Sequence, residues 1–210
     1  MIECVLFDSD GTLVDSEFIC NKAIAIMFEE LGVQLDAEQL MIQYKGGKMT
    51  EVLAHISTKN AVTLPSDFIP RYRTLVNELF VADLKPIDGI VEVLEALDVP
   101  IAVVSNGPKT KVEKALEICG LQHYFKDNIY SAYDIQCWKP DAGLYLNAAK
   151  DMGFSHSQCA VVEDSSTGVQ AGLNANMTTC YYDKFNQPFD NKKVIHFNSM
   201  HDLPNILKRL

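Results

Sequence analysis

Short apolar runs alternate along this chain with longer stretches in which apolar residues recur at helical spacing. Runs typical of buried parallel strands lie at 2–8, 101–105 and 160–162. A weaker strand is predicted at 128–132, and further strands at 177–182 and near 193–197. Helical patterns separate the later runs, at 89–97, 108–119, 140–152 and 166–175. Because strands that alternate with helices pair side by side and in parallel, the pattern predicts an α/β fold with a Rossmann-like, doubly wound and mostly parallel sheet.

One segment departs from this alternation, because residues 15–84 show helical patterns and no convincing strand. The helices are predicted at 16–31, from Asp36 onward, at 49–57 and from about 65 to 83. Ser16 is a candidate cap for the first helix, and Asp36 with Gln39 forms a variant of the capping box for the second. We therefore predict an all-helical cap domain over 15–84, inserted into an α/β core formed by 1–14 and 85–210.

Composition narrows the classes of partner and location. The 210 residues carry a formal net charge of −10, which argues against nucleic-acid binding because that function needs a basic face. No apolar stretch approaches the roughly 20 residues that span a bilayer, and the first residues lack the basic start of a secretory signal. Six scattered cysteines form no C-x-x-C pair. We expect a cytoplasmic protein without a membrane partner, as a monomer or weak homodimer.

Polar residues gather where the predicted strands end. Asp8 and Asp10 follow the first run, Ser105 ends the second, Lys139 lies after a weaker strand, and Glu163-Asp164 follows the 160–162 run. Because parallel strands deliver their carboxyl ends to one edge of the sheet, we expect these groups to lie together. Carboxylates suit a hard cation, while a hydroxyl and an ammonium suit phosphate, so the set predicts a phosphoryl-transfer site.

Each of these segments also has a purely structural explanation. Residues 10–12 alone could form a turn, 105–107 and 163–165 could cap helices, and 139–141 could be a solvated helix start. Their occurrence together, each at a strand end and in this order, favours the functional explanation.

The same segments resemble the motifs of the haloacid dehalogenase superfamily. Asp8-Ser9-Asp10-Gly11-Thr12-Leu13-Val14-Asp15-Ser16 is similar to its first motif, and Ser105, Lys139 and Glu163-Asp164 are similar to the other three. The helical insertion between the first and second motifs resembles the small cap of its phosphatases. The resemblance spans essentially the whole chain. It implies a phosphoric monoester hydrolase that acts on a small phosphorylated metabolite.

The resemblance also implies a role for each motif residue. Asp8 would be the nucleophile that forms an aspartyl-phosphate, and Asp10 would be the general acid and then the general base. The implied Mg²⁺ ligands are the Asp8 carboxylate, the Asp10 backbone carbonyl and Asp164. Glu163 would bind the cation directly or, as the better fit, through a water molecule or another ligand. The implied phosphate-binding residues are Ser105, Lys139 and, as an additional donor, Asn106.

The sequence identifies the substrate less precisely than the reaction. The segments at 44–46, 104–108, 133–136 and 138–141 resemble members of the family that hydrolyse 6-phosphogluconate, which makes this sugar phosphate the leading candidate substrate. Lys45, Gly46 and Lys48 are the candidate specificity residues, although Lys48 could equally be a solvated surface lysine.

Two alternatives to the phosphatase remain at this point. A β-phosphoglucomutase-like sugar-phosphate mutase would need the same Asp8 and Asp10. Those mutases, however, carry a cap histidine where this chain has Cys20. A binding or regulatory module that keeps the fold without the reaction would not depend on Asp8.

Overall fold

The structure is a computed structural model that describes residues 1–45, 47–184 and 189–210. The chain forms two compact units. One unit is an α/β unit of Met1–Val14 and Lys85–Leu210, and the other is a helical unit of Asp15–Leu84. Gly46, one of the candidate specificity residues, lies outside the described residues.

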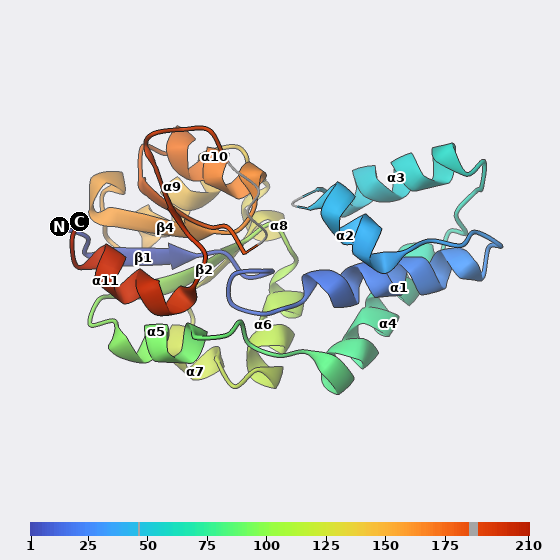
Figure 1. Cartoon of the computed structure of the whole chain (residues 1–210), viewed down its shortest axis with the longest axis horizontal. Helices are drawn as coiled ribbons and strands as arrows, with labels where there is room; N and C mark the ends of the chain where they lie inside the picture. Colours follow the sequence, from blue (N-terminus) through green and yellow to red (C-terminus); the bar gives the residue numbers. More distant parts are fainter. Residues whose placement is uncertain (46, 185–188) are drawn as a thin grey trace. The chain divides into compact units, whose positions relative to one another are not determined.

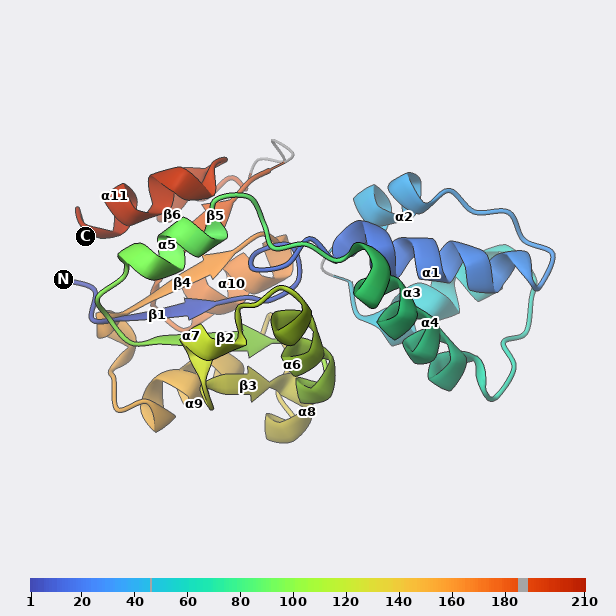
Figure 2. The same ribbon diagram turned by 90° about the horizontal axis from the view of Figure 1, so that it is seen from below.

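A single parallel sheet organises the α/β unit (Figures 1 and 2). In the described part of the chain it has six strands in the order β3-β2-β1-β4-β5-β6, and every neighbouring pair is parallel. The strands are β1 (Cys4–Phe7), β2 (Ile101–Ser105), β3 (Ile129–Ser131), β4 (Cys159–Glu163), β5 (Thr178–Tyr182) and β6 (Val194–Phe197). The prediction of a doubly wound parallel sheet is therefore confirmed.

Helices cover both faces of this sheet. They are α5 (Ile90–Ala96), α6 (Lys109–Ile118), α7 (Gln122–Phe125), α8 (Ala132–Ile135), α9 (Gly143–Asp151), α10 (Ser166–Asn174) and α11 (Leu203–Leu207). Figure 1 shows α9 and α10 on one face, with α5, α7 and α11 on the other. Because neither face meets solvent, β1, β2 and β4 are apolar at nearly every position, which is the pattern that the sequence shows.

The strand β1 shows how the core divides between the two faces. Leu6 packs in one cluster with Leu144 and Tyr145 of α9. Phe7 points to the opposite face, where its ring meets Phe125 of α7 edge-on with centroids 6.3 Å apart. All of these side chains are fully buried. Alternate residues of one short strand therefore anchor both helical layers.

The helical unit contains α1 (Glu17–Glu29), α2 (Ala37–Tyr44), α3 (Met49–Lys59) and α4 (Phe68–Asp83). Helix α1 packs against α2 and α4, and the Phe28 and Phe68 rings meet edge-on at 5.5 Å. Asp36 caps α2 as predicted, because its carboxylate accepts the Gln39 backbone N–H at 2.9 Å. No strand occurs among the described residues of this unit.

Several predicted helix boundaries and caps need correction. Ser16 precedes α1 but has helical backbone angles and makes no side-chain capping bond, since a cap requires an extended backbone. Helix α9 begins at Gly143 instead of Pro140. The Asp141 carboxylate accepts a hydrogen bond from the Gly143 N–H at 2.7 Å, and this bond stabilises a turn before the helix. The short helices α7, α8 and α11 were not predicted, since four or five residues are too few to show a helical period.

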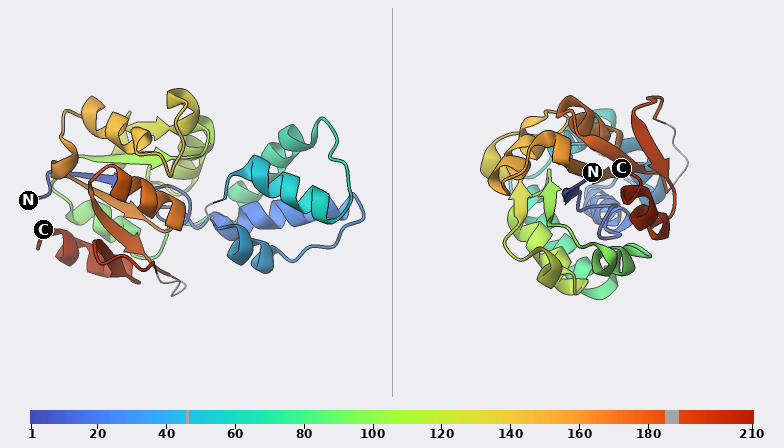
Figure 3. Two further views of the ribbon diagram at one scale, coloured as in Figure 1. Left: turned by 90° about the horizontal axis from the view of Figure 1, so that it is seen from above. Right: turned by 90° about the vertical axis from the view of Figure 1, so that its left-hand side faces the viewer.

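The strand order also fixes where a ligand site can form. The chain runs outward from β1 to β2 and β3 on one side, and then to β4, β5 and β6 on the other. Such a reversal opens a crevice at the carboxyl ends of β1 and β4. The two termini lie near each other at the opposite end of this unit (Figure 3). No described helix is both long enough and apolar enough to cross a membrane.

Helix α9 offers a matched test of the core. Leu144 is fully buried whereas Leu146, on the same helix, is 40% exposed. We expect Leu144→Ala to lower the free energy of unfolding by about 2–5 kcal/mol, because it removes buried methyl groups and leaves a cavity. Leu146→Ala should change it by about 0.5 kcal/mol or less. Urea unfolding followed by circular dichroism measures both, and equal losses would show that α9 does not pack as described.

Candidate active site

Most of the predicted site residues lie at the carboxyl ends of β1 and β4. Asp8 follows β1 directly, Glu163 is the last residue of β4, and Asp164 comes next. Strands β1 and β4 pair in register from Cys4 with Cys159 to Phe7 with Val162, so the residues that follow lie side by side. Lys139 reaches the same place from the loop between α8 and α9.

Lys139 is the centre of this arrangement. Its ammonium donates to the Asp8 carboxylate at 2.5 Å, to the Glu163 carboxylate at 2.6 Å and to the Val104 carbonyl at 2.7 Å. Only 3% of its side chain is exposed. An ammonium has three protons, so these bonds use its full donor capacity and join the ends of β1, β2 and β4.

Glu163 supports Lys139 and is fully buried. The oxygen that accepts from Lys139 also accepts from the Tyr145 hydroxyl at 2.8 Å. Its second oxygen accepts from the Asp164 and Ser165 backbone N–H groups and from the Ser165 hydroxyl, at 3.1–3.3 Å. With both oxygens bonded to protein donors, Glu163 is better suited to orient neighbouring groups than to bind a cation directly.

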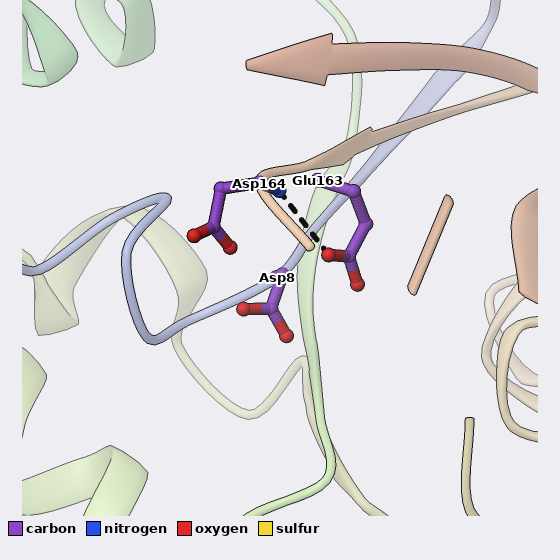
Figure 4. A group of neighbouring side chains, drawn as sticks. All are labelled: Asp8, Glu163 and Asp164. Atoms are coloured by element: carbon purple, nitrogen blue, oxygen red, sulfur yellow. Dashed lines mark hydrogen bonds between the residues drawn. The ribbon is translucent and has the colours of Figure 1, made fainter. Parts of the chain in front are cut away.

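Three carboxylates nevertheless meet here, as Figure 4 shows. Asp8, Glu163 and Asp164 each offer an oxygen within 4.8 Å of the others. Three carboxylates against the single Lys139 ammonium leave a formal charge of −2 in this group of four. Oxygen donors with that excess charge fit a divalent hard cation such as Mg²⁺.

The turn after β1 is shaped to admit Asp164. Gly11 has a φ of +81°, and a Cβ at this position would overlap the Asp164 carboxylate. Thr12, which is fully buried, donates its hydroxyl to Asp164 at 3.4 Å. The Gly-Thr of the first motif therefore makes room for the acidic residue of the fourth and orients it.

The ionisation of the cluster follows from this crowding. Burial, with help from the charges of Glu163 and Asp164, raises the pKa of Asp8 well above its usual range, although Lys139 acts in the other direction. Burial acts to lower the pKa of Lys139, but the carboxylates of Asp8 and Glu163 outweigh it and leave this pKa raised. Burial therefore disfavours the charged form of Asp8, while the neighbouring carboxylates favour the charged form of Lys139.

The loop after β2 is held in place by hydroxyl groups. Ser105 accepts the Gly107 backbone N–H on its Oγ at 3.0 Å, which leaves its own proton available to a ligand. Ser131, at the end of β3, donates its hydroxyl to the Gly107 carbonyl at 2.7 Å. Neighbouring strands thus fix the loop that follows Ser105.

Asn106 bonds to the Lys139 segment in this structure, and its predicted contact with phosphate stays a prediction. Its Oδ1 accepts the Lys139 backbone N–H at 2.9 Å, and its Nδ2 donates to the Lys139 carbonyl at 3.4 Å. The amide therefore bonds to both backbone groups of one residue. Its function in this structure is to hold the Lys139 segment against the end of β2.

Asp10 lies beside a lysine that the sequence pattern did not single out. The Lys111 ammonium is 2.7 and 2.8 Å from the two Asp10 carboxylate oxygens. Lys111 belongs to α6, where it looks like any solvated helical lysine in the sequence. Tyr145 was missed for a similar reason, since in sequence it is an ordinary apolar-face aromatic of α9.

The remaining predicted site residues belong to the helical unit. Lys45 is half-buried at the end of α2, and Lys48 is exposed immediately before α3. Their assignment as specificity residues stays a prediction.

Comparison with known proteins supports the motif assignment. A sequence model of the haloacid dehalogenase-like hydrolase family matches residues 5–182. The chain is 41% identical over 210 residues to the 6-phosphogluconate phosphatase of Escherichia coli (strain K12), covering 99% of this chain and 95% of that protein. It is 30% identical over 176 residues to the fructose-1-phosphate phosphatase of the same strain, covering 82% and 92%. A crystal structure of a related family hydrolase from Deinococcus radiodurans R1, with bound phosphate and sodium, matches with a TM-score of 0.78 and 29% identity, covering 99% and 96%.

The chain therefore belongs to the haloacid dehalogenase-like hydrolase family. Within that family it is an enzyme of the phosphoric monoester hydrolase class. Both statements agree with what the motifs implied.

The raised pKa of Asp8 gives a pH-dependent stability prediction. An aspartate whose pKa is raised by folding costs stability once the pH exceeds that of the unfolded carboxyl, about 3.9. With EDTA present, Asp8→Asn should therefore raise the free energy of unfolding at pH 8 and leave it almost unchanged below about pH 4. Urea unfolding at several pH values measures the difference.

Asp141 provides a control of opposite sign. The Gly143 N–H lowers the pKa of this exposed carboxyl, so the charged form is the one that stabilises the fold. Asp141→Asn should thus reduce stability at pH 8. A stabilising effect of both substitutions, or of neither, would contradict the conclusion that folding raises the pKa of Asp8.

Proposed function

We propose that this protein hydrolyses phosphate monoesters of sugars and sugar acids in a Mg²⁺-dependent reaction, with 6-phosphogluconate as its leading substrate. The observation that carries the proposal is the contact of Asp8 with the buried Lys139 beside Asp164, at the carboxyl ends of β1 and β4. The 41% identity to a 6-phosphogluconate phosphatase over nearly the whole chain supports the choice of substrate.

In the first step, Asp8 attacks the phosphorus of the ester. One of its oxygens accepts from Lys139, and the other is the nucleophile. As the new oxygen–phosphorus bond forms, the bond to the sugar oxygen breaks and Asp10 gives that oxygen its proton. The products are the free sugar alcohol and an aspartyl-phosphate on Asp8.

In the second step, water attacks the phosphorus of the aspartyl-phosphate. Asp10, now a carboxylate, takes a proton from the water, and the bond between phosphorus and Asp8 breaks. Inorganic phosphate leaves, Asp8 is restored as a carboxylate, and Asp10 again carries its proton. Ser105 would donate to a phosphoryl oxygen in both steps.

Asp8, Asp164 and the backbone carbonyl of Asp10 would hold the cation, with Glu163 orienting them from behind. Bound Mg²⁺ would offset the carboxylate charge and polarise the phosphoryl group. Lys139, whose three protons all bind the protein, would hold Asp8 in position for attack.

Substrate choice would depend on the helical unit as well as on the catalytic unit. Lys45 lies at the end of α2 and Lys48 immediately before α3, and ammonium groups suit the carboxylate of a sugar acid. We propose a cytoplasmic location for the enzyme, supported by the buried thiols of Cys4, Cys159 and Cys180. We further propose that it is a monomer or weak homodimer that binds neither nucleic acid nor membranes.

The substrate proposal predicts a ranking. Among phosphorylated sugars and sugar acids with Mg²⁺, 6-phosphogluconate should have the highest kcat/KM, and Asp8→Asn should abolish phosphate release. Lys48→Met should lower kcat/KM for 6-phosphogluconate about tenfold but leave glucose 6-phosphate nearly unaffected, because only the acid presents a carboxylate to it. Isomerisation of β-glucose 1-phosphate without phosphate release would favour the mutase instead. Activity that survives Asp8→Asn would contradict both enzymes.

The metal site predicts a specific effect of Gly11. Mg²⁺ at a hundred times its dissociation constant should stabilise the wild-type protein by about 2.7 kcal/mol. In Gly11→Ala the new methyl group displaces Asp164, so most of this Mg²⁺-dependent shift in melting temperature should be lost. Gly153→Ala is the matched control, since Gly153 has a φ of +84° but open space around its Cβ position. It should lose stability and keep the shift, whereas an equal shift in all three proteins would place the cation elsewhere.

A further inference from the structure

The contact between Lys111 and Asp10 is not explained by the motifs of the family. The ammonium bridges both carboxylate oxygens, at 2.7 and 2.8 Å, and the two side chains are 26% and 30% exposed. An ammonium shared by both oxygens restricts rotation of the carboxylate more than a single bond would. Such a contact fixes which way the Asp10 carboxylate faces.

The backbone on the Asp10 side of this contact is firmly held. The Gly11 N–H donates to the Val14 carbonyl at 2.9 Å, and the Leu13 N–H donates to the Ser9 carbonyl at 2.9 Å. These bonds close a tight turn immediately after β1. The main chain of Asp10 therefore has a defined place, and its side-chain torsions are the principal freedom that remains.

The backbone on the Lys111 side is equally constrained. Lys111 lies in the first turn of α6, whose start is tied to the sheet through Gly107. Ser105 and Ser131 bind the N–H and carbonyl of Gly107 from β2 and β3. Because both partners start from fixed backbone, the ion pair sets the direction of the Asp10 carboxylate relative to Asp8.

We propose that Lys111 is a positioning residue that aims the Asp10 carboxyl group at the leaving oxygen of the substrate. The proposal rests on the proposed function, in which Asp10 transfers the proton. Asp10 remains the group that touches the reacting atoms, and Lys111 acts through it. When Asp10 is ionised, Lys111 bridges both oxygens, as in this structure. When Asp10 is protonated, Lys111 would bind one oxygen while the other carries the proton toward the leaving oxygen. Misplacing a proton donor by about 1 Å can cost on the order of a hundredfold in rate, so the effect should be large enough to measure.

The test compares two esters that differ in their need for a proton. A sugar alkoxide leaves poorly without protonation, whereas p-nitrophenolate leaves without it. The parameter is kcat/KM, because it reports the steps up to formation of the aspartyl-phosphate and not its later hydrolysis. Lys111→Met should lower kcat/KM for 6-phosphogluconate by roughly tenfold to a hundredfold, mainly through kcat, and for p-nitrophenyl phosphate by about threefold or less.

Two further variants of α6 complete the comparison. Lys111→Arg keeps a cation that can bridge a carboxylate, so it should recover most of the lost activity. Lys114→Met is the matched control, because Lys114 lies one turn further along α6 and pairs at the surface with Glu117. It should behave as the wild type with both esters. Equal losses for both esters in Lys111→Met would overturn the proposal and assign Lys111 to phosphate binding.

A double-mutant cycle provides an independent check. If Lys111 acts only through Asp10, adding Lys111→Met to Asp10→Asn should cause almost no further loss, about twofold at most. A full additional loss would overturn the proposal, as would an unchanged 6-phosphogluconate rate in Lys111→Met alone. A wild-type protein that hydrolyses neither ester would instead refute the proposed function, so the two failures can be told apart.

Discussion

The active-site architecture depends on one buried ammonium group. Lys139 bonds to groups from three neighbouring strand ends, the Asp8 carboxylate, the Val104 carbonyl and the Glu163 carboxylate. Burying a charge is costly unless it is both paired and fully hydrogen-bonded, and here both conditions are met. Since each partner comes from a different strand, the arrangement requires the parallel register of β2, β1 and β4. The sheet and the site therefore depend on each other.

The sequence predicted the fold well where burial is simple. Strands β1, β2 and β4 are covered on both faces, so each has a continuous apolar run that predicts a buried strand. Short elements such as α8 and α11 leave too few residues to show a period. The start of α9 was misplaced because a side-chain bond of Asp141 competes with the helix, and such a bond is invisible to a hydrophobic pattern.

Site residues were predictable where the topology brings strand ends together. Asp8, Ser105, Lys139 and Asp164 follow apolar runs, so their position alone suggested a shared site. Lys111 lies on a helix, where a lysine is ordinary in composition and spacing. Its importance arises only from the approach of α6 to the turn after β1, a tertiary contact that no local pattern encodes.

Asn106 shows what such architecture implies for the evolution of the enzyme. Its amide forms hydrogen bonds with both the N–H and the carbonyl of Lys139, as a neighbouring strand would. It therefore links the segment of the second motif to that of the third. An asparagine needed for this purpose would be retained across relatives with quite different substrates. In an alignment, its column would look like that of a catalytic residue. Invariance at position 106 would then record a constraint on geometry, and conservation alone would not distinguish this constraint from a contact with the substrate.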